Sequence, residues 1–156
     1  MPVLRLRDLT PDDWRDWRAL RLQALAEAPY AFGSTLVDWQ DAPEERWRGR
    51  LAEVAYNLIA ELDDRPAGMA SGTLDGDGPA ELISMWVAPF ARGAGVGAAL
   101  IDAVAVWAAV RRPGELVLQV VDGNEPAIGL YQRAGFVDRG IVADSNPPER
   151  LMSRPL

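Results

Sequence analysis

The sequence predicts a single α/β domain of mixed type, built on a twisted sheet of about seven strands. Three apolar runs separated by turn-forming residues occupy the middle of the chain and are typical of an antiparallel meander. A strand, a glycine-rich turn, a helix and another strand then follow between residues 80 and 121, and such a unit requires a right-handed parallel crossover. The sheet is therefore expected to mix antiparallel and parallel strands within one domain that covers residues 1–156.

The first third of the chain is expected to supply one strand and two helices. Val3–Leu6 alternates like a strand, and Thr10–Asp13 is a typical helix start, with acidic residues at the positive end of the helix dipole. Apolar residues within Trp14–Leu25 then recur at helical spacing. A second helix is expected near Asp41–Val54, and the aromatic segment Pro29–Gln40 before it, which has no clear period, is interpreted as a loop.

The middle of the chain is expected to hold the meander, one long helix and a further strand. Tyr56–Leu62, Ala67–Leu74 and Ala80–Val87 are apolar runs bounded by acidic and glycine-rich turns. The helix expected at Gly97–Val110 is apolar nearly all round, which predicts that it is buried. Leu116–Val121 has the pattern of a buried strand.

The last third is expected to contain a short helix and two strands. The helix, Glu125–Ala134, has Pro126 in its first turn and Gly135 after its end. Phe136–Ile141 and Arg150–Arg154 then fit two final strands. The predicted order is strand, two helices, three strands, helix, strand, helix and two strands.

The chain contains no cysteine and no histidine. These absences exclude disulfides, zinc fingers, thiol nucleophiles and the usual Ser-His-Asp arrangement, and they remove most transition-metal sites. Carboxylates, tyrosines, arginines and backbone amides are the chemical groups that remain. The composition therefore favours direct group transfer without an acyl-enzyme, and no metal is expected.

Charge and hydropathy restrict the partners. The net charge is -7 and the pI is about 4.6, so nucleic acid is not an expected partner. The longest apolar stretch, Val96–Val110, is interrupted by Asp102 and is too short to span a bilayer. Met1–Leu9 alternates apolar and charged residues, unlike a secretory signal. We therefore expect a cytoplasmic protein with no membrane partner.

The glycine-rich turn Arg92–Gly97 is the first candidate site. It joins a strand to a helix, where unpaired amides and the helix dipole favour an anion, although a tight connector alone would explain the glycines. Gly93-x-Gly95-x-x-Ala98 also matches a dinucleotide-binding fingerprint, with Asp122 as a candidate ribose ligand. Three preceding antiparallel strands and the short remaining chain disfavour that doubly wound alternative.

Two spaced motifs together resemble one family. The turn reads Arg92-x-x-Gly95-x-Gly97, and the family's diphosphate loop is written Arg/Gln-x-x-Gly-x-Gly/Ala. On this pattern and a second block after the next strand, the chain resembles the GCN5-related N-acetyltransferase (GNAT) superfamily. The resemblance implies that acetyl-CoA is the co-substrate. The second block is Asn124-x-x-Ala127-x-x-x-Tyr131-x-x-x-Gly135-Phe136.

The resemblance also implies where the coenzyme binds. Backbone amides of the turn would hold the diphosphate, and main-chain groups of the preceding strand would bind the pantetheine arm where the strands that begin at Ala80 and Leu116 splay apart. A splay leaves backbone donors and acceptors unpaired, and an amide-containing arm can satisfy them as a substitute strand. The expected coenzyme-binding residues are Met85, Trp86, Val87, Arg92, Gly93, Ala94, Gly95, Val96, Gly97, Asn124, Ala127 and Tyr131.

Two residues are candidates for catalysis. Glu81 lies eleven positions before Arg92, where histone-modifying members of the family carry a general-base glutamate; a solvated strand-end glutamate is the alternative. In the family, the tyrosine that matches Tyr131 protonates or hydrogen-bonds the departing thiolate. Tyr131 lies two helical turns after Asn124, on the same face, and a core tyrosine is the alternative role.

The expected function is acetyl transfer from acetyl-CoA to a primary amine of a small molecule or peptide, in a ternary complex. Family analogy bounds the acceptor by the segments 29–41 and 142–149, with Tyr30, Phe32 and Trp39 as candidate contacts. A non-catalytic coenzyme-binding module is the rival function, and a homodimer is left open. Acids that could attract the cationic acceptor are Asp38, Asp41, Asp144 and Glu149.

Overall fold

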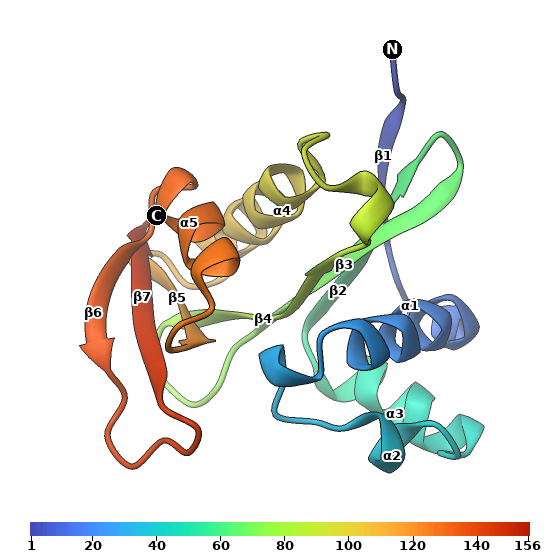
Figure 1. Ribbon diagram of the computed structural model, residues 1–156, viewed down its shortest axis with the longest axis horizontal. Coiled ribbons are helices and arrows are strands. Elements are labelled where there is room, and N and C mark those ends of the chain that lie inside the picture. The colour runs from blue at the N-terminus through green and yellow to red at the C-terminus, as the bar shows by residue number, and fades with distance from the viewer.

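The computed structural model describes residues 1–156, and seven strands form one sheet in the order β1-β2-β3-β4-β5-β7-β6 (Figure 1). All neighbouring strands are antiparallel except β4 and β5, which run parallel. The predicted mixed sheet with its meander is confirmed, and the dinucleotide-binding alternative is wrong because the sheet is not doubly wound. The strands are β1 (Leu4–Asp8), β2 (Tyr56–Leu62), β3 (Arg65–Thr73), β4 (Ala80–Val87), β5 (Glu115–Val121), β6 (Val137–Ile141) and β7 (Glu149–Pro155).

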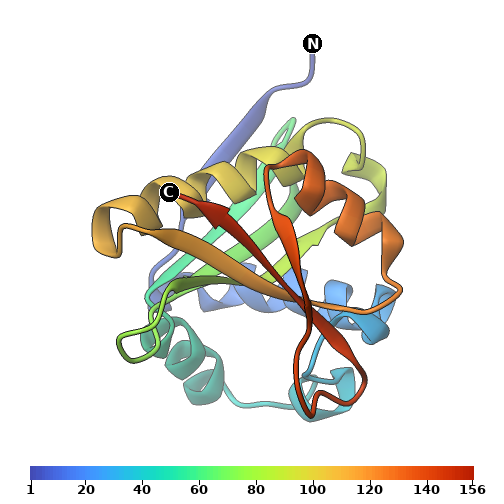
Figure 2. The same cartoon turned by 90° about the vertical axis from the view of Figure 1, so that its left-hand side faces the viewer.

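Helices cover both faces of the sheet, with α4 and α5 on one face and α1, α2 and α3 on the other (Figures 1 and 2). The segment 29–40, expected to be a loop, contains a short 3-10 helix (Pro29–Ala31) and one turn of α-helix. That turn forms because the hydroxyl of Thr35 accepts a hydrogen bond from the amide of Asp38 (3.3 Å) and caps it. The α-helices are α1 (Trp14–Glu27), α2 (Leu36–Trp39), α3 (Glu44–Glu53), α4 (Val96–Arg111) and α5 (Glu125–Arg133).

A separate apolar core lies between the sheet and each helical layer. The core on the α4 side includes Leu100, Ile101 and Leu118. The core on the α1 side includes Trp17 and Trp47, both fully buried, in agreement with their helical spacing. The sheet is thus the middle of three layers, and its two faces present different sets of side chains.

The expectation that α4 is buried all round is wrong. Leu100 and Val104 are fully buried against the sheet, but Val106 and Val110 are 68% and 73% exposed on the opposite side. The helix covers one face of a single sheet, and no other layer packs on its outer side (Figure 2). No helix in the chain reaches the length and apolar content that a bilayer crossing requires.

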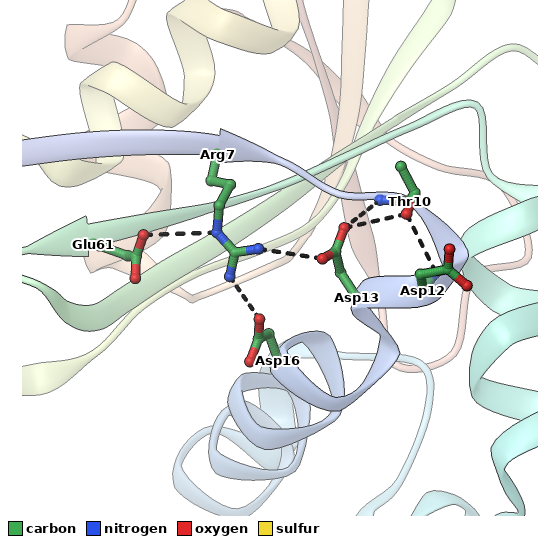
Figure 3. A network of polar contacts seen from close by, with 6 residues as sticks. All are labelled: Arg7, Thr10, Asp12, Asp13, Asp16 and Glu61. Carbon is green, nitrogen blue, oxygen red and sulfur yellow. Dashed lines mark hydrogen bonds and ion pairs between the residues drawn. The ribbon is translucent and has the colours of Figure 1, made fainter.

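The junction between β1 and α1 is fixed by charged groups (Figure 3). Asp13 accepts a hydrogen bond from the amide of Thr10 (2.8 Å) and closes a capping box, so the helix start predicted there is confirmed. Arg7 on β1 forms ion pairs with Asp16 (2.6 Å) and Asp13 (3.3 Å). These contacts anchor the first turn of α1 to the edge of the sheet, and they raise the pKa of Arg7.

Candidate functional site

The sheet opens between its two parallel strands. β4 and β5 pair only at Ala80–Leu116 and Glu81–Val117, although β4 continues to Val87. Beyond these pairs β5 remains hydrogen-bonded to β7 on its other side. The edge of β4 that faces β5 is therefore without a strand partner over most of its length, which confirms the predicted splay (Figure 1).

A β-bulge in β4 lies at the start of this opening. Trp86 pairs with Met69 and Ile83 with Ser71, so two residues of β4 oppose one residue of β3. Ser84, one of the two, has φ of 54°, in the left-handed region that non-glycine residues rarely adopt. The extra residue shifts the alternation of the strand by one position. Each residue after the bulge therefore faces the side of the sheet opposite to the one that strict alternation assigns.

The bulge determines the place of three residues that the resemblance assigns to the coenzyme. Met85 and Val87 pack against the core on the α4 side, whereas Trp86 belongs to the core on the α1 side and is 5% exposed. The indole nitrogen of Trp86 donates a hydrogen bond to Glu27 (2.9 Å). The Trp86 side chain therefore lies in the core, away from the opening, so only its main chain is left for the expected contact with the coenzyme.

The turn from Arg92 to the start of α4 presents unpaired amides. Gly93 and Gly95 have φ of 85° and 83°, a backbone conformation that glycine adopts without strain, and open space surrounds both α-carbons. Gly95 is the N-cap of α4, and its carbonyl accepts a hydrogen bond from the amide of Ala99 (3.1 Å). The turn can therefore receive an anion. The amides without a protein acceptor are those of Gly93, Gly95, Val96, Gly97 and Ala98.

The side chain of Arg92 does not point to these amides. Its Nε donates a hydrogen bond to the carbonyl of Val87 (3.1 Å), and its Nη2 forms an ion pair with Glu27 (3.0 Å). The hydrogen bond from Trp86, and then the contacts with Arg92, lower the pKa of Glu27. Arg92 thus ties the turn to the end of β4 and to the last turn of α1.

The first turn of α4 passes close to α5. A methyl group added to Gly97 would lie 3.1 Å from a side-chain carbon of Leu130 and 3.5 Å from Met85, so glycine permits this approach. Ala127 is half-buried against the same core. Asn124 is the N-cap of α5, and its carbonyl accepts a hydrogen bond from the amide of Ile128 (3.0 Å). The two motif segments therefore lie beside each other.

Tyr131 lies on α5 and is buried, with 8% of its surface exposed. Its ring meets that of Phe136 edge to face, with ring centroids 5.9 Å apart. Burial raises the pKa of Tyr131 well above its ordinary value. The phenol therefore keeps its proton at physiological pH and can act as a hydrogen-bond donor.

A cleft of about 440 Å³ lies on the α1 side of the opening. Glu81 and Ser84 line it from β4, and Tyr30 and Phe32 from the segment that follows α1, so the structure brings these predicted residues together. Trp39 does not reach the cleft. Its ring centroid lies 4.7 Å from that of Trp47 in the helical layer, so the structure does not bring Trp39 together with the other residues expected to contact the acceptor.

Carboxylates surround Glu81 on its side of the cleft. Burial raises the pKa of Glu81, and the charges of Asp75 and Glu149 raise it further. Glu149 lines the cleft, whereas Asp38, Asp41 and Asp144, also expected to attract the acceptor, do not. A carboxylate of raised pKa is a stronger base than an ordinary glutamate. No group of three or more acidic side chains is arranged to hold a metal ion.

Two arginines near the cleft were not singled out by the sequence analysis. Arg21 lines the cleft, and Arg50 donates a hydrogen bond to the hydroxyl of Ser84 (3.1 Å). Arg21 stands four positions after Trp17 and three before Ala24, both buried, so its place on the inner face of α1 could have been found from helical spacing. The sixteen basic residues are all arginine, so composition alone does not distinguish it.

A sheet that opens between two parallel strands, beside unpaired amides at a helix N-terminus, is the arrangement that the resemblance to coenzyme-dependent acyltransferases implies. The model of the acetyltransferase (GNAT) family matches residues 7–136. The chain belongs to this family.

Curated relatives agree with that membership. The chain is 35% identical over 142 residues to the mycothiol acetyltransferase of Clavibacter sepedonicus. The aligned region covers 90% of this chain and 45% of that protein. It is 32% identical over 139 residues to the mycothiol acetyltransferase of Thermobispora bispora. The aligned region covers 85% of this chain and 46% of that protein. The chain thus spans less than half the length of the curated relatives it matches.

Solved structures of similar fold cover the whole chain. An acetyltransferase of the GNAT family from Streptococcus pneumoniae has a TM-score of 0.78 at 23% identity, with 97% of this chain and 98% of that chain covered. A ribosomal-protein-alanine N-acetyltransferase from Brucella melitensis has a TM-score of 0.74 at 25% identity, with 97% of this chain and 99% of that chain covered. The fold of the domain is therefore shared from its first strand to its last.

Proposed function

We propose that this chain transfers an acetyl group from acetyl-CoA directly to a primary amine of a small molecule or peptide. The observation that carries the proposal is the position of Glu81. It lies at the last paired position of β4 and β5, in the cleft that begins where the strands separate. A base at that point lies beside the opening that would admit the thioester.

The residues of the opening fit the coenzyme. The unpaired amides between Gly93 and Ala98 suit a diphosphate, and the open space around the α-carbons of Gly93 and Gly95 allows it to approach the backbone. Main-chain groups of Met85 and Val87 would pair with the pantetheine arm along the free edge of β4. Bound acetyl-CoA supplies the acetyl group as an activated thioester.

Glu81 would prepare the acceptor. An amine with a lysine-like pKa of about 10.4 is almost wholly protonated at neutral pH and has no lone pair with which to attack. Glu81 accepts one proton from the ammonium, directly or through water, and its raised pKa suits it to this task. The nitrogen then bonds to the acetyl carbon and releases a second proton as the amide forms.

Tyr131 would stabilise the leaving group. As the carbon–sulfur bond breaks, its electron pair goes to sulfur. The raised pKa of Tyr131 keeps the phenol protonated, so a hydrogen bond to the developing thiolate is favoured over full proton transfer. The proton that the amide nitrogen releases goes to the thiolate. The products are the N-acetyl compound and coenzyme A.

A screen of amines for thiol release tests the proposal. Wild-type protein is incubated with acetyl-CoA and each of a panel of small amines and short peptides, and coenzyme binding is measured in parallel by calorimetry. The curated relatives are named mycothiol acetyltransferases, so the amine that a mycothiol acetyltransferase acetylates is included in the panel. We expect release above background with one class of amine. Tight coenzyme binding with background release throughout would instead identify a non-catalytic coenzyme-binding module.

A further inference from the structure

Arg21 is a partly buried cation without an anionic partner at the wall of the cleft. Its guanidinium carbon lies 4.5 Å from the ring centroid of Phe32, a cation–π contact. No carboxylate forms an ion pair with Arg21, and its Nη1 is buried without any hydrogen-bond partner. A buried guanidinium is normally paired, because desolvation of its charge is costly.

The charge of Arg21 persists despite its burial. Desolvation lowers the pKa of Arg21 to about 10, so the side chain is still protonated at neutral pH. Deprotonation therefore does not relieve this cost at neutral pH, and no carboxylate offsets the charge. An anion that entered through the cleft would supply the missing hydrogen-bond acceptor and the missing charge.

A second cation lies behind the same end of the cleft. Arg50 donates hydrogen bonds to the side-chain oxygens of Asn57 (2.9 Å), Ser71 (3.2 Å) and Ser84 (3.1 Å), all of them neutral. Desolvation lowers the pKa of Arg50 to about 10, and the charge of Arg21 contributes to that shift. The charge of Glu53 raises the pKa of Arg50 in part, but neither arginine forms an ion pair with a carboxylate.

The opposite end of the cleft is acidic. Glu81 and Glu149 line it, and the charge of Glu149 raises the pKa of Glu81. Glu81 and Ser84 are three residues apart on β4, which places the two ends about 10 Å apart along the strand. The cleft thus has separate positive and negative ends.

We propose that the acceptor is a small zwitterion, with its amine at Glu81 and its carboxylate bound by Arg21. The inference rests on the proposed acetyl transfer and specifies the acceptor of that same site. The amine and the carboxylate are separated by a few carbon atoms, because the cleft is small, at about 440 Å³, and its charged ends are close. Arg21 would act as a specificity residue that recognises the end of the acceptor that does not react.

The first test compares ω-amino acids of two to six carbons with unbranched alkylamines of the same length. Thiol release by the wild-type protein is measured, and rates are compared at equal concentrations of unprotonated amine. We expect at least one amino acid to exceed its matched alkylamine about 10- to 100-fold in kcat/KM, as for a charge-assisted hydrogen bond in a buried site. Equal rates for the two series would overturn the proposal.

The second test uses variants. Arg21→Met should abolish the preference, so that the ratio of kcat/KM for the amino acid to that for its alkylamine falls to about one, and Arg21→Lys should restore part of it. Arg15→Met is the matched control, since Arg15 is an exposed residue of the same helix outside the cleft. If Arg21→Met retained the full preference, or if Arg15→Met also lost it, Arg21 would not be the carboxylate site.

Calorimetry separates failure of this inference from failure of the proposed function. Protein saturated with coenzyme A is titrated with a preferred ω-amino acid and with its alkylamine. Tighter binding of the amino acid, lost in Arg21→Met, would support the carboxylate site even where no turnover occurs. Turnover of both series without any difference in binding would keep the acetyltransferase proposal and reject the zwitterion. Equal acetylation of a peptide as its free acid and as its amide would reject it as well.

Discussion

Glu27 holds the guanidinium of Arg92 at 3.0 Å, although 65 positions separate the two residues in the chain. The indole of Trp86 donates to the same carboxylate at 2.9 Å. The last turn of α1, the bulged strand β4 and the start of the amide-lined turn therefore meet at one carboxylate. Because Arg92 opens the turn, this contact positions the amides that we assign to the coenzyme diphosphate.

Glu27→Gln should weaken coenzyme binding. The amide still accepts a hydrogen bond from Trp86 but loses the charge that holds Arg92, so we expect the Kd of acetyl-CoA to rise about 3- to 10-fold. Calorimetry measures this, with Glu45→Gln as the control, because Glu45 is exposed and makes no ion pair. An unchanged Kd would separate the carboxylate from the coenzyme site.

The same substitution should have a pH-dependent effect on stability. The folded protein lowers the pKa of Glu27, so the stability contributed by its charge is present above the unfolded pKa, near 4.3, and is lost as pH falls through the folded value. Thermal melts at pH 7 should place Glu27→Gln below the wild type in Tm. The gap should be smaller in melts at pH values below 4, and it closes once the pH is below the lowered pKa of the folded state. A gap of the same size at both pH values would contradict the assignment.

Gly95→Ala should weaken coenzyme binding through the backbone alone. Nothing lies within 4 Å of the added methyl group, but φ of 83° is unfavourable for alanine by about 1–2 kcal/mol. A shift of the turn to relieve this strain would turn its amides away from one another. We expect the Kd of acetyl-CoA to rise about 10-fold or more, consistent with the loss of two or more anion contacts.

Gly49→Ala is the matched control for that change. Gly49 lies inside α3, again with nothing within 4 Å of the added methyl group, and it does not have a positive φ. Alanine there should leave coenzyme binding unchanged and stabilise the protein by about 0.5–1 kcal/mol, because glycine is a poor helix former. Equal effects of both substitutions on coenzyme binding would show that the conformation of the turn is not what matters.

Much of this site could be predicted from sequence, because its two motifs sit at the junctions of regular elements. Periodicity placed the strand before Arg92 and the helix after Gly97, and a right-handed crossover then determined which strand follows. The bulge could not be predicted, since nothing in Ser84 or Met85 marks it. Strict alternation along β4 puts Trp86 on the same face as Ala80, and the bulge reverses that assignment.

The part of the site that would bind the acceptor was harder to predict from the sequence. Tyr30 and Phe32 were selected as aromatic residues of the segment that family analogy assigns to the acceptor. The same reasoning selected Trp39, although that side chain packs on Trp47. Arg21 had a usable signal, since it lies on the buried face of α1. Its lack of a carboxylate partner depends on contacts between segments far apart in the chain, which spacing along a single helix does not report.

Glu81→Gln should remove a titration from the pH profile of kcat/KM. The raised pKa of Glu81 predicts that wild-type activity increases as pH rises through that value, because only the carboxylate accepts a proton. Glutamine cannot serve as a base, so we expect activity about 100- to 10,000-fold lower and without this acidic limb. Coenzyme binding should be retained. A variant with near wild-type kcat and the same acidic limb would exclude Glu81 as the base.

Glu81→Gln should also stabilise the protein above neutral pH. The folded state raises the pKa of Glu81, so the wild type gains stability from this group below the unfolded pKa and loses it as pH rises through the folded pKa. Glutamine removes a partly buried charge that Asp75 and Glu149 repel. We expect Tm to rise by about 1–3 °C at pH 8, with no rise at pH values below 4. A lower Tm at pH 8 would contradict the repulsion.

Tyr131→Phe should lower kcat while leaving coenzyme binding intact. The substitution removes only the hydroxyl and keeps the edge-to-face contact with Phe136, so the fold around α5 is preserved. Loss of one hydrogen bond to the developing thiolate predicts a kcat about 10- to 100-fold lower, with the Kd of acetyl-CoA within about twofold of wild type. Single-turnover kinetics would place the loss in the chemical step rather than in product release.

Tyr56→Phe is the control for Tyr131. Tyr56 donates a hydrogen bond to Asp8 (2.8 Å) and stacks on Trp107 at the other end of the sheet, so its loss should cost stability and not turnover. Because burial raises the pKa of Tyr131, ionisation of its phenol should not contribute a basic limb to the wild-type profile below about pH 10. If activity fell between pH 8 and 10 in the wild type and not in Tyr131→Phe, the tyrosine would titrate as an acid during turnover. The buried phenol would then transfer its proton to sulfur, and the hydrogen-bonding role argued from its burial would be wrong.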